Sequence, residues 1–118
     1  MLSIALLALL GAAQACTAPA QDAECEALID YALVVDNSAS IVNDTDSITQ
    51  FLQDFVAEFN VADGYVKFSV IAFGYTVETL TPLTSDSSTI DNAITNRGDQ
   101  GGSTNIAAAL YALSLIHI

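Results

Sequence analysis

Hydrophobic residues in this chain follow strand and helix periods in turn. Residues 31–35 are apolar at every position, which is typical of a central strand covered on both faces. A helical period follows after residues 44–47, which supply N-cap chemistry, and Asp63 and Gly64 are expected to end that helix. Its apolar face comprises five positions that we predict to pack in the core: Ile48, Phe51, Leu52, Phe55 and Phe59.

Two strands are predicted next. Val66–Phe73 is rich in β-branched and aromatic residues, Gly74 interrupts the run, and residues 76–80 read as a shorter strand. The short connection between the two strands permits an antiparallel hairpin. Pro82 is expected to end the strand pattern, because proline cannot donate to a sheet ladder.

Two further helices are predicted in the last third of the chain. The first has its cap at Ser87 and Ser88, and the second opens at Ser103 or Thr104. A glycine-containing loop over residues 97–102 separates them. The order β-α-β-β-α-α predicts one α/β domain with a Rossmann-like open, mostly parallel sheet and helices on both faces.

The N-terminus has the pattern of a secretory signal peptide. Residues 2–10 are apolar but too short to span a bilayer, and residues 13–15 form a small-x-small cleavage signature. We therefore expect a signal peptide at 1–15, with Ala20 as an alternative cleavage point, a flexible lead-in at 16–28, and a secreted, extracellular protein.

Cysteine and asparagine positions agree with a secreted protein. Cys16 and Cys25 could pair with each other in an oxidising compartment, whereas cleavage after Ala20 would leave Cys25 without that partner. Asn43 lies in an N-glycosylation sequon.

The charge of the chain is strongly negative. Fourteen acidic residues against Lys67 and Arg97 give a net charge of −12. Such a surface repels nucleic acid and anionic membranes and attracts cations or basic partners. The acidity could equally serve only to keep a secreted protein in solution.

The candidate chemistry follows the first predicted strand. Asp36, Ser38 and Ser40 alternate along a loop at its carboxyl end, where open α/β sheets bind ligands. One carboxylate and two hydroxyls can converge on a hard cation such as Mg²⁺, which requires oxygen ligands. Thr104, after two glycines at a helix start, is the candidate from a second loop. Few of these ligands are charged, so the ion would keep an open position for a carboxylate from another molecule.

This pattern resembles the first half of a von Willebrand factor type A domain, over about residues 28–112. The strand followed by D-x-S-x-S resembles the first segment of that family's metal-ion-dependent adhesion site, and residues 101–105 resemble the second. The resemblance implies metal ligation by Asp36, Ser38, Ser40 and Thr104, with Mg²⁺ as the ion and Mn²⁺ or Ca²⁺ as substitutes. It implies cation-dependent adhesion to a matrix or cell-surface protein that donates an acidic side chain.

The family's third segment, an aspartate after a later strand, has no counterpart in this sequence. The later strands beside the first strand would also be missing, so we expect that strand to have an unpaired apolar edge. The last six residues, 113–118, are encoded by CTG TCT CTT ATA CAC ATC, which looks like a transposase adapter used in sequencing libraries. We expect a partial domain at 29–112 and an artefact after it.

Two other functional classes compete with this interpretation of the sequence. One is a structural interaction module of the same fold without a functional metal, in which Asp36, Ser38 and Ser40 only cap a turn. The other is a hydrolase that uses Asp36 as a nucleophile, but a second acid two positions on is replaced by Ser38. A serine hydrolase would need a G-x-S-x-G elbow and a histidine, and the sole histidine, His117, lies in the suspect tail. We therefore expect no enzymatic activity.

Overall fold

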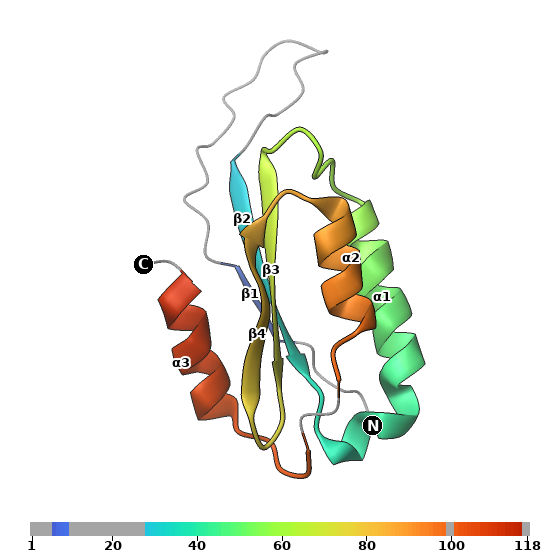
Figure 1. Ribbon diagram of the computed structural model, residues 1–118, viewed down its shortest axis with the longest axis vertical. Coiled ribbons are helices and arrows are strands. Elements are labelled where there is room, and N and C mark those ends of the chain that lie inside the picture. Colours follow the sequence, from blue (N-terminus) through green and yellow to red (C-terminus); the bar gives the residue numbers. More distant parts are fainter. Residues whose placement is uncertain (1–5, 10–27, 99–100, 117–118) are drawn as a thin grey trace.

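A computed structural model of the chain describes residues 6–9, 28–98 and 101–116 (Figure 1). The elements run β1 (Leu6–Leu9), β2 (Ile29–Asp36), the 3₁₀ helix η1 (Ala39–Asp44), α1 (Thr45–Ala57), β3 (Val66–Phe73), β4 (Val77–Thr84), α2 (Ser87–Thr95) and α3 (Ile106–Ile116).

The four strands form one sheet in the order β1-β2-β3-β4. β2 and β3 are parallel over their whole length, with Asp36 opposite Phe73 at their carboxyl ends. β3 and β4 form the predicted antiparallel hairpin. The α/β prediction is confirmed, although the described sheet is mixed, with one parallel pairing and two antiparallel ones.

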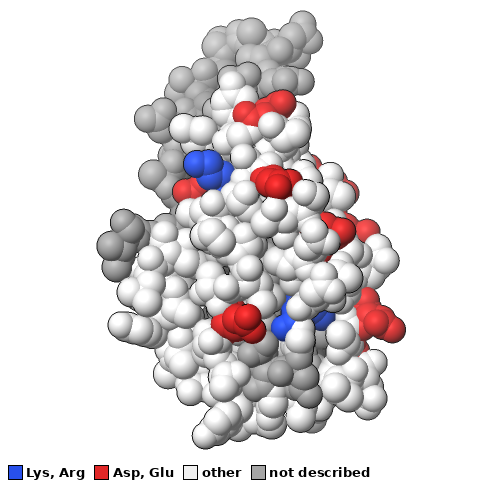
Figure 2. Space-filling view, viewed as in Figure 1, with Lys and Arg blue, Asp and Glu red and all other residues white. Residues whose placement is uncertain are grey.

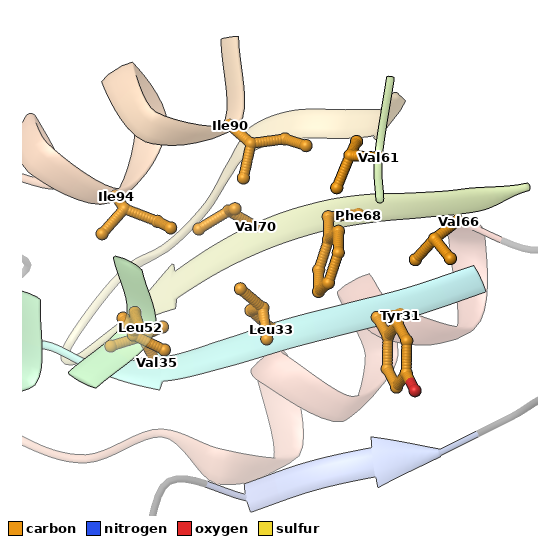
Figure 3. Close-up of a cluster of buried hydrophobic side chains, with 10 residues drawn as sticks. All are labelled: Tyr31, Leu33, Val35, Leu52, Val61, Val66, Phe68, Val70, Ile90 and Ile94. Carbon is orange, nitrogen blue, oxygen red and sulfur yellow. The ribbon is translucent and has the colours of Figure 1, made fainter. Parts of the chain in front are cut away.

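Helices cover both faces of the sheet, as predicted. Figure 1 shows α1 and α2 together on one side of the strands and α3 on the other. The sheet has a hydrophobic core on each face. Alternate residues of β2 point to opposite faces and so contribute to both cores. Leu33 lies in the core under α1 and α2, whereas Val34 packs with Ala109 and Leu113 of α3. Figure 3 shows ten side chains of the larger core.

An aromatic cluster sits at the end of that core remote from the β2 carboxyl end. Phe68 is fully buried, its ring stacks on Tyr31 with centroids 5.1 Å apart, and Phe55 and Phe59 meet it edge-on. The predicted apolar face of α1 is thus confirmed for Ile48, Leu52 and Phe55, and Phe59 packs in the same core although it lies beyond the end of the helix. The prediction is wrong for Phe51, which is 58% exposed because it lies at the edge of the helical face.

Several predicted boundaries are wrong. α1 ends at Ala57, well before Gly64, whose φ of 78° belongs to the following turn. The strand predicted over residues 76–80 extends to Thr84 and includes Pro82. Proline is tolerated there because β4 lies at the edge of the described sheet, where its nitrogen needs no partner.

The helix starts also differ from the sequence prediction. The stretch before α1 forms η1, and no side chain caps α1 at Asp44. The cap of α2 is Asp86, whose carboxylate accepts from the amide of Ser88. α3 begins at Ile106, after Asn105 accepts from the amide of Ala108. Short polar side chains at helix starts explain both caps.

The edge of β2 that was expected to be unpaired carries β1. Residues of β1 pair antiparallel with β2, from Leu6 opposite Val34 to Leu9 opposite Tyr31. This expectation was therefore wrong for the uncleaved chain, because part of the predicted signal peptide occupies that edge. Removal of the signal peptide stays a prediction.

Two predictions concern the ends of the chain, and the structure tests neither of them. Cys16 and Cys25 lie outside the described residues. Part of the predicted artefact, residues 113–116, continues α3, where Leu113 is buried. An apolar adapter translation can extend a helix as readily as a native segment, so the origin of this tail stays a prediction.

Replacing Phe68 with alanine should destabilise the protein strongly. Truncating a fully buried phenylalanine removes its contacts with the aromatic cluster and leaves a cavity, at a cost of about 3–5 kcal/mol. Urea unfolding followed by circular dichroism measures the loss. Phe51→Ala is the matched control and should shift the midpoint much less, since Phe51 is mostly exposed. Equal shifts in the two variants would contradict this core assignment.

The cap at Asp86 should make stability depend on acid pH. Hydrogen bonds from the side chain of Thr89, then from Ser88, lower the pKa of Asp86 below its ordinary value of 3.8. A carboxyl with a lowered folded-state pKa stabilises above its unfolded pKa and loses that effect as the pH falls. Asp86→Ala should lower the urea midpoint at pH 7, and the difference from the parent should narrow below pH 3.8. Asp86→Asn, which keeps an accepting oxygen, is the control. A difference in urea midpoint between Asp86→Ala and the parent that stays constant from pH 7 to below pH 3.8 would contradict the prediction.

Candidate metal site at the carboxyl edge of the sheet

The first loop of the site is fixed to the sheet by backbone contacts. β2 ends at Asp36, and the amide of Asn37 donates to the carbonyl of Phe73 at 2.7 Å, which extends the parallel pairing by one step. The Asp36 carboxylate then accepts from the amide of Ser38 at 2.9 Å. This turn directs the chain away from the sheet edge into η1, so the side chains of the loop gather there.

The hydroxyls of two distant segments meet at this loop. Ser38 Oγ lies 3.2 Å from Ser40 Oγ. Thr104, 66 positions later in the chain, donates from Oγ1 to Ser38 Oγ at 3.4 Å. The structure therefore brings the four sequence-predicted residues together, with Ser38 at the centre and 2% exposed, Asp36 half-buried, and Ser40 and Thr104 exposed.

The second loop is held in place by the β3–β4 turn. The amide of Asn105 donates to the carbonyl of Gly74 at 2.9 Å, which anchors the residue next to Thr104. Gly101 has a φ of 81°, a conformation that glycine adopts without strain. A Cβ at Gly101 would meet the Cβ of Tyr75 at 3.7 Å, so the loop passes close to the turn.

The spacing of the oxygens fits a shared cation. Neighbouring ligands of an octahedral Mg²⁺ at 2.0–2.1 Å lie about 2.9 Å apart, and those of Ca²⁺ at longer bonds lie about 3.3–3.7 Å apart. The hydroxyl separations of 3.2 and 3.4 Å fall in this range. The residues present therefore suit a divalent cation, and the spacing does not choose among ions.

The ligand set is poor in charge. Asp36 is the one carboxylate among the four residues, and the other three donors are hydroxyls. Within the described ranges, no group of three or more histidine, cysteine, aspartate or glutamate side chains is close enough to hold a metal. The sequence signature of the site is therefore a set of hydroxyl side chains with one carboxylate, and not a cluster of acidic side chains. Figure 2 shows acidic groups scattered over one face of the molecule.

Arg97 joins the two helices beside the site. Its guanidinium donates to the carbonyl of Ile94 at 2.8 Å, to the hydroxyl of Thr49 at 3.0 Å and to the carbonyl of Thr45 at 3.3 Å. The bond to Ile94 satisfies a carbonyl group in the last turn of α2. Burial lowers the pKa of Arg97 below its ordinary value.

A cavity beside the metal loop was missed by the sequence reasoning. It has a volume of about 260 Å³ and lies between the loop, η1, the start of α1 and the end of α2. Its lining residues are Asn37, Ser38, Val42, Thr45, Thr95, Arg97 and Gly98. The sequence feature that pointed toward this cavity was the asparagine inside the D-x-S-x-S pattern. The local sequence does not show that residues near 95 line the same cavity.

Asn43, the predicted glycosylation acceptor, is exposed in η1, as an acceptor must be. Among the described residues, no helix combines the length and the apolar character needed to cross a membrane.

Comparisons with known proteins agree with this geometry. The family profile of the von Willebrand factor type A domain matches residues 31–116. No curated protein sequence gives a significant match. Among solved structures, an uncharacterized membrane-spanning protein from Vibrio fischeri shares the fold, with a TM-score of 0.66, 22% identity, and coverage of 75% of this chain and 48% of that one.

A mussel protein is also similar. Proximal thread matrix protein 1 from the mussel byssus, in a structure with a zinc-occupied MIDAS motif, matches with a TM-score of 0.65 and 27% identity. That match covers 73% of this chain and 24% of the mussel chain. A second structure of the same mussel protein gives a TM-score of 0.61 and 29% identity, with 78% and 25% covered.

The chain thus spans about half the length of the Vibrio protein and about a quarter of the mussel protein. The family profile extends over more than half of the 118 residues, including the strand β2, the hydroxyl loop and the segment that carries Thr104. This chain belongs to the von Willebrand factor type A domain family.

Proposed function

We propose that this protein is an extracellular binding module that holds a divalent cation and recognises a protein ligand through it. Asp36, Ser38, Ser40 and Thr104 would hold the ion. The observation that supports this most is the meeting of the Ser38 and Thr104 hydroxyls, 66 positions apart in the chain. A turn cap alone would not require an oxygen from a second loop.

The residues of the site have separate roles in this proposal. Ser38 is nearly buried and would bind the ion from below, at the end of the sheet. Asp36 is tied to the amide of Ser38 and would fix the loop, either at the ion or through a bound water. Ser40 and Thr104 are exposed, so the ion would be reachable from solvent.

When bound, the cation supplies an electrophile with an open position. One carboxylate neutralises only half of its charge, so an acidic side chain of the partner is attracted. Unit charges 4 Å apart attract by about 4 kcal/mol at an intermediate dielectric constant, before desolvation is counted. Such an attraction is large enough to anchor a protein contact, and it requires no general base.

Mg²⁺ is the proposed ion, with Mn²⁺ or Ca²⁺ as substitutes. Hydroxyl and carboxylate oxygens are hard ligands that suit Mg²⁺, and an exposed site lets the ion keep part of its water shell. The mussel relative is named for zinc in its MIDAS motif, which supports a divalent cation in general.

A metal-free interaction module is the second candidate. Its support is that the hydroxyls of Ser38, Ser40 and Thr104 already contact one another in the structure. In that case the loops would be a rigid platform, and partner binding would be indifferent to EDTA. A hydrolase that uses Asp36 would instead lose turnover of a phosphate ester in Asp36→Asn.

The double variant Ser38→Ala plus Ser40→Ala should lose ion binding. Removing two of the three hydroxyls should weaken Mg²⁺ at least tenfold, as measured by isothermal titration calorimetry after EDTA treatment and dialysis. The loss of their mutual hydrogen bond should cost only about 1 kcal/mol of stability. The control Ser47→Ala plus Ser114→Ala changes exposed serines outside the site and should bind like the parent. Unchanged binding in the first variant would refute the site.

The proposed extracellular location is tested by secretion of the chain. Expressed in eukaryotic secretory cells, the protein should enter the medium with Cys16 or Gln21 as its first residue, and Asn43→Gln should remove any glycan mass. Leu7→Arg interrupts the apolar run and should keep the protein inside the cell. Protein sequencing and intact mass spectrometry read the result, and an intracellular parent with Met1 retained would contradict the proposal.

A further inference from the structure

The cavity beside Ser38 shares a residue with the metal site. Ser38 lines the cavity and also contacts the hydroxyls of Ser40 and Thr104. A ligand residue anchored at the ion would therefore place its sequence neighbours within reach of this cavity. Its volume of about 260 Å³ gives room for a side chain rather than a single water.

Asn37 is one of the polar residues that line the cavity. Its backbone is fixed by the 2.7 Å bond to the carbonyl of Phe73, and the residue is only 7% exposed. No hydrogen bond joins its carboxamide to any residue in the described parts of the chain. The carboxamide is not among the fully buried side-chain groups that lack a partner, so its atoms keep contact with solvent and are open to a bound water or a ligand.

Two hydroxyl groups on the cavity wall are engaged within the protein. The hydroxyl of Thr45 donates to the carbonyl of Val42 at 3.0 Å, and that of Thr95 accepts from Gln53 at 3.3 Å. Arg97 donates into the helix ends. The carboxamide of Asn37 has no such bond to a described residue, and it offers a ligand both a donor and an acceptor.

The remaining wall is apolar and open. Val42 lies on η1 and is 59% exposed, although the residue before it, Ile41, is buried. An exposed valine beside a polar asparagine suits a side chain with methylene groups along its length and a donor and an acceptor at its end. Primary carboxamides have that form, and two carboxamides pair through reciprocal hydrogen bonds.

We propose that this cavity is a specificity subsite for a carboxamide side chain, that of glutamine, next to the acidic residue of the ligand. Asn37 pairs with the carboxamide, and Val42 contacts the methylene groups. This inference rests on the proposed metal-dependent function, because the ion supplies the anchor and the cavity selects the neighbour. A carboxylate in the same place would lose one of the two bonds, since it has no donor.

Two matched peptides test the subsite. Acetyl-Gly-Gln-Asp-Gln-Gly-amide and acetyl-Gly-Leu-Asp-Leu-Gly-amide carry the same acid with glutamine or leucine on both sides. In the presence of Mg²⁺, the glutamine peptide should bind the isotope-labelled protein at least fivefold more tightly in an NMR titration. The side-chain amide signals of Asn37 should shift with the glutamine peptide only.

Variants of Asn37 assign the preference to the cavity. Asn37→Leu has nearly the same size and should abolish or reverse the preference for glutamine. Asn37→Asp keeps the shape but loses the donor, and should reduce it. Asn92→Leu changes an exposed asparagine on α2 that does not line the cavity and should behave as the parent.

The outcomes separate this inference from the proposed function. Equal binding of both peptides that EDTA abolishes would overturn the subsite and leave the metal-dependent function intact. A glutamine preference that survives in Asn37→Leu would also overturn the subsite. Binding of neither peptide at millimolar concentration, or binding that is indifferent to EDTA, would overturn the metal-dependent function and, with it, the anchored subsite.

Discussion

The parallel pairing of β2 with β3 is the constraint on which the site depends. It brings two carboxyl ends to one edge, and backbone bonds then fix a loop on each end. Asn37 donates to the carbonyl of Phe73, and Asn105 donates to that of Gly74. Without these bonds, the hydroxyls of Ser38 and Thr104 would have no reason to meet. The candidate metal site is thus a property of the sheet edge and not of either loop alone.

The chemistry of this edge differs from that of an acidic metal cage. Asp36 supplies one charge, and hydroxyls supply the rest, so a bound cation would remain attractive to an outside carboxylate. The protein's net charge of −12 gives the same region a favourable potential for cations and an unfavourable one for acidic partners until the ion is in place. Cation binding and ligand binding are therefore expected to be coupled.

The packing of the fold and the side chains at its surface contribute to this site in different ways. The cores on both sides of β2 hold the sheet edge rigid, because Leu33 and Val34 are buried on opposite faces. Arg97 links α2 to the start of α1 and so borders the cavity beside the metal loop. The packing thus positions the loops, while the specificity of the surface depends on side chains such as Asn37 that contribute little to the core.

The sequence by itself determined the fold class, the order of elements from β2 to α3, and the four metal candidates. Continuous apolar runs, helical periods and hydroxyls at a strand end are local patterns, and each predicts a type of element or site on physical grounds. The tertiary structure decided which ends met, that Phe51 lay outside the core and that Pro82 was tolerated in an edge strand. It also placed β1 against β2 and set Asn37 across a cavity from Thr95. Those features depend on contacts between distant segments, which no local pattern encodes.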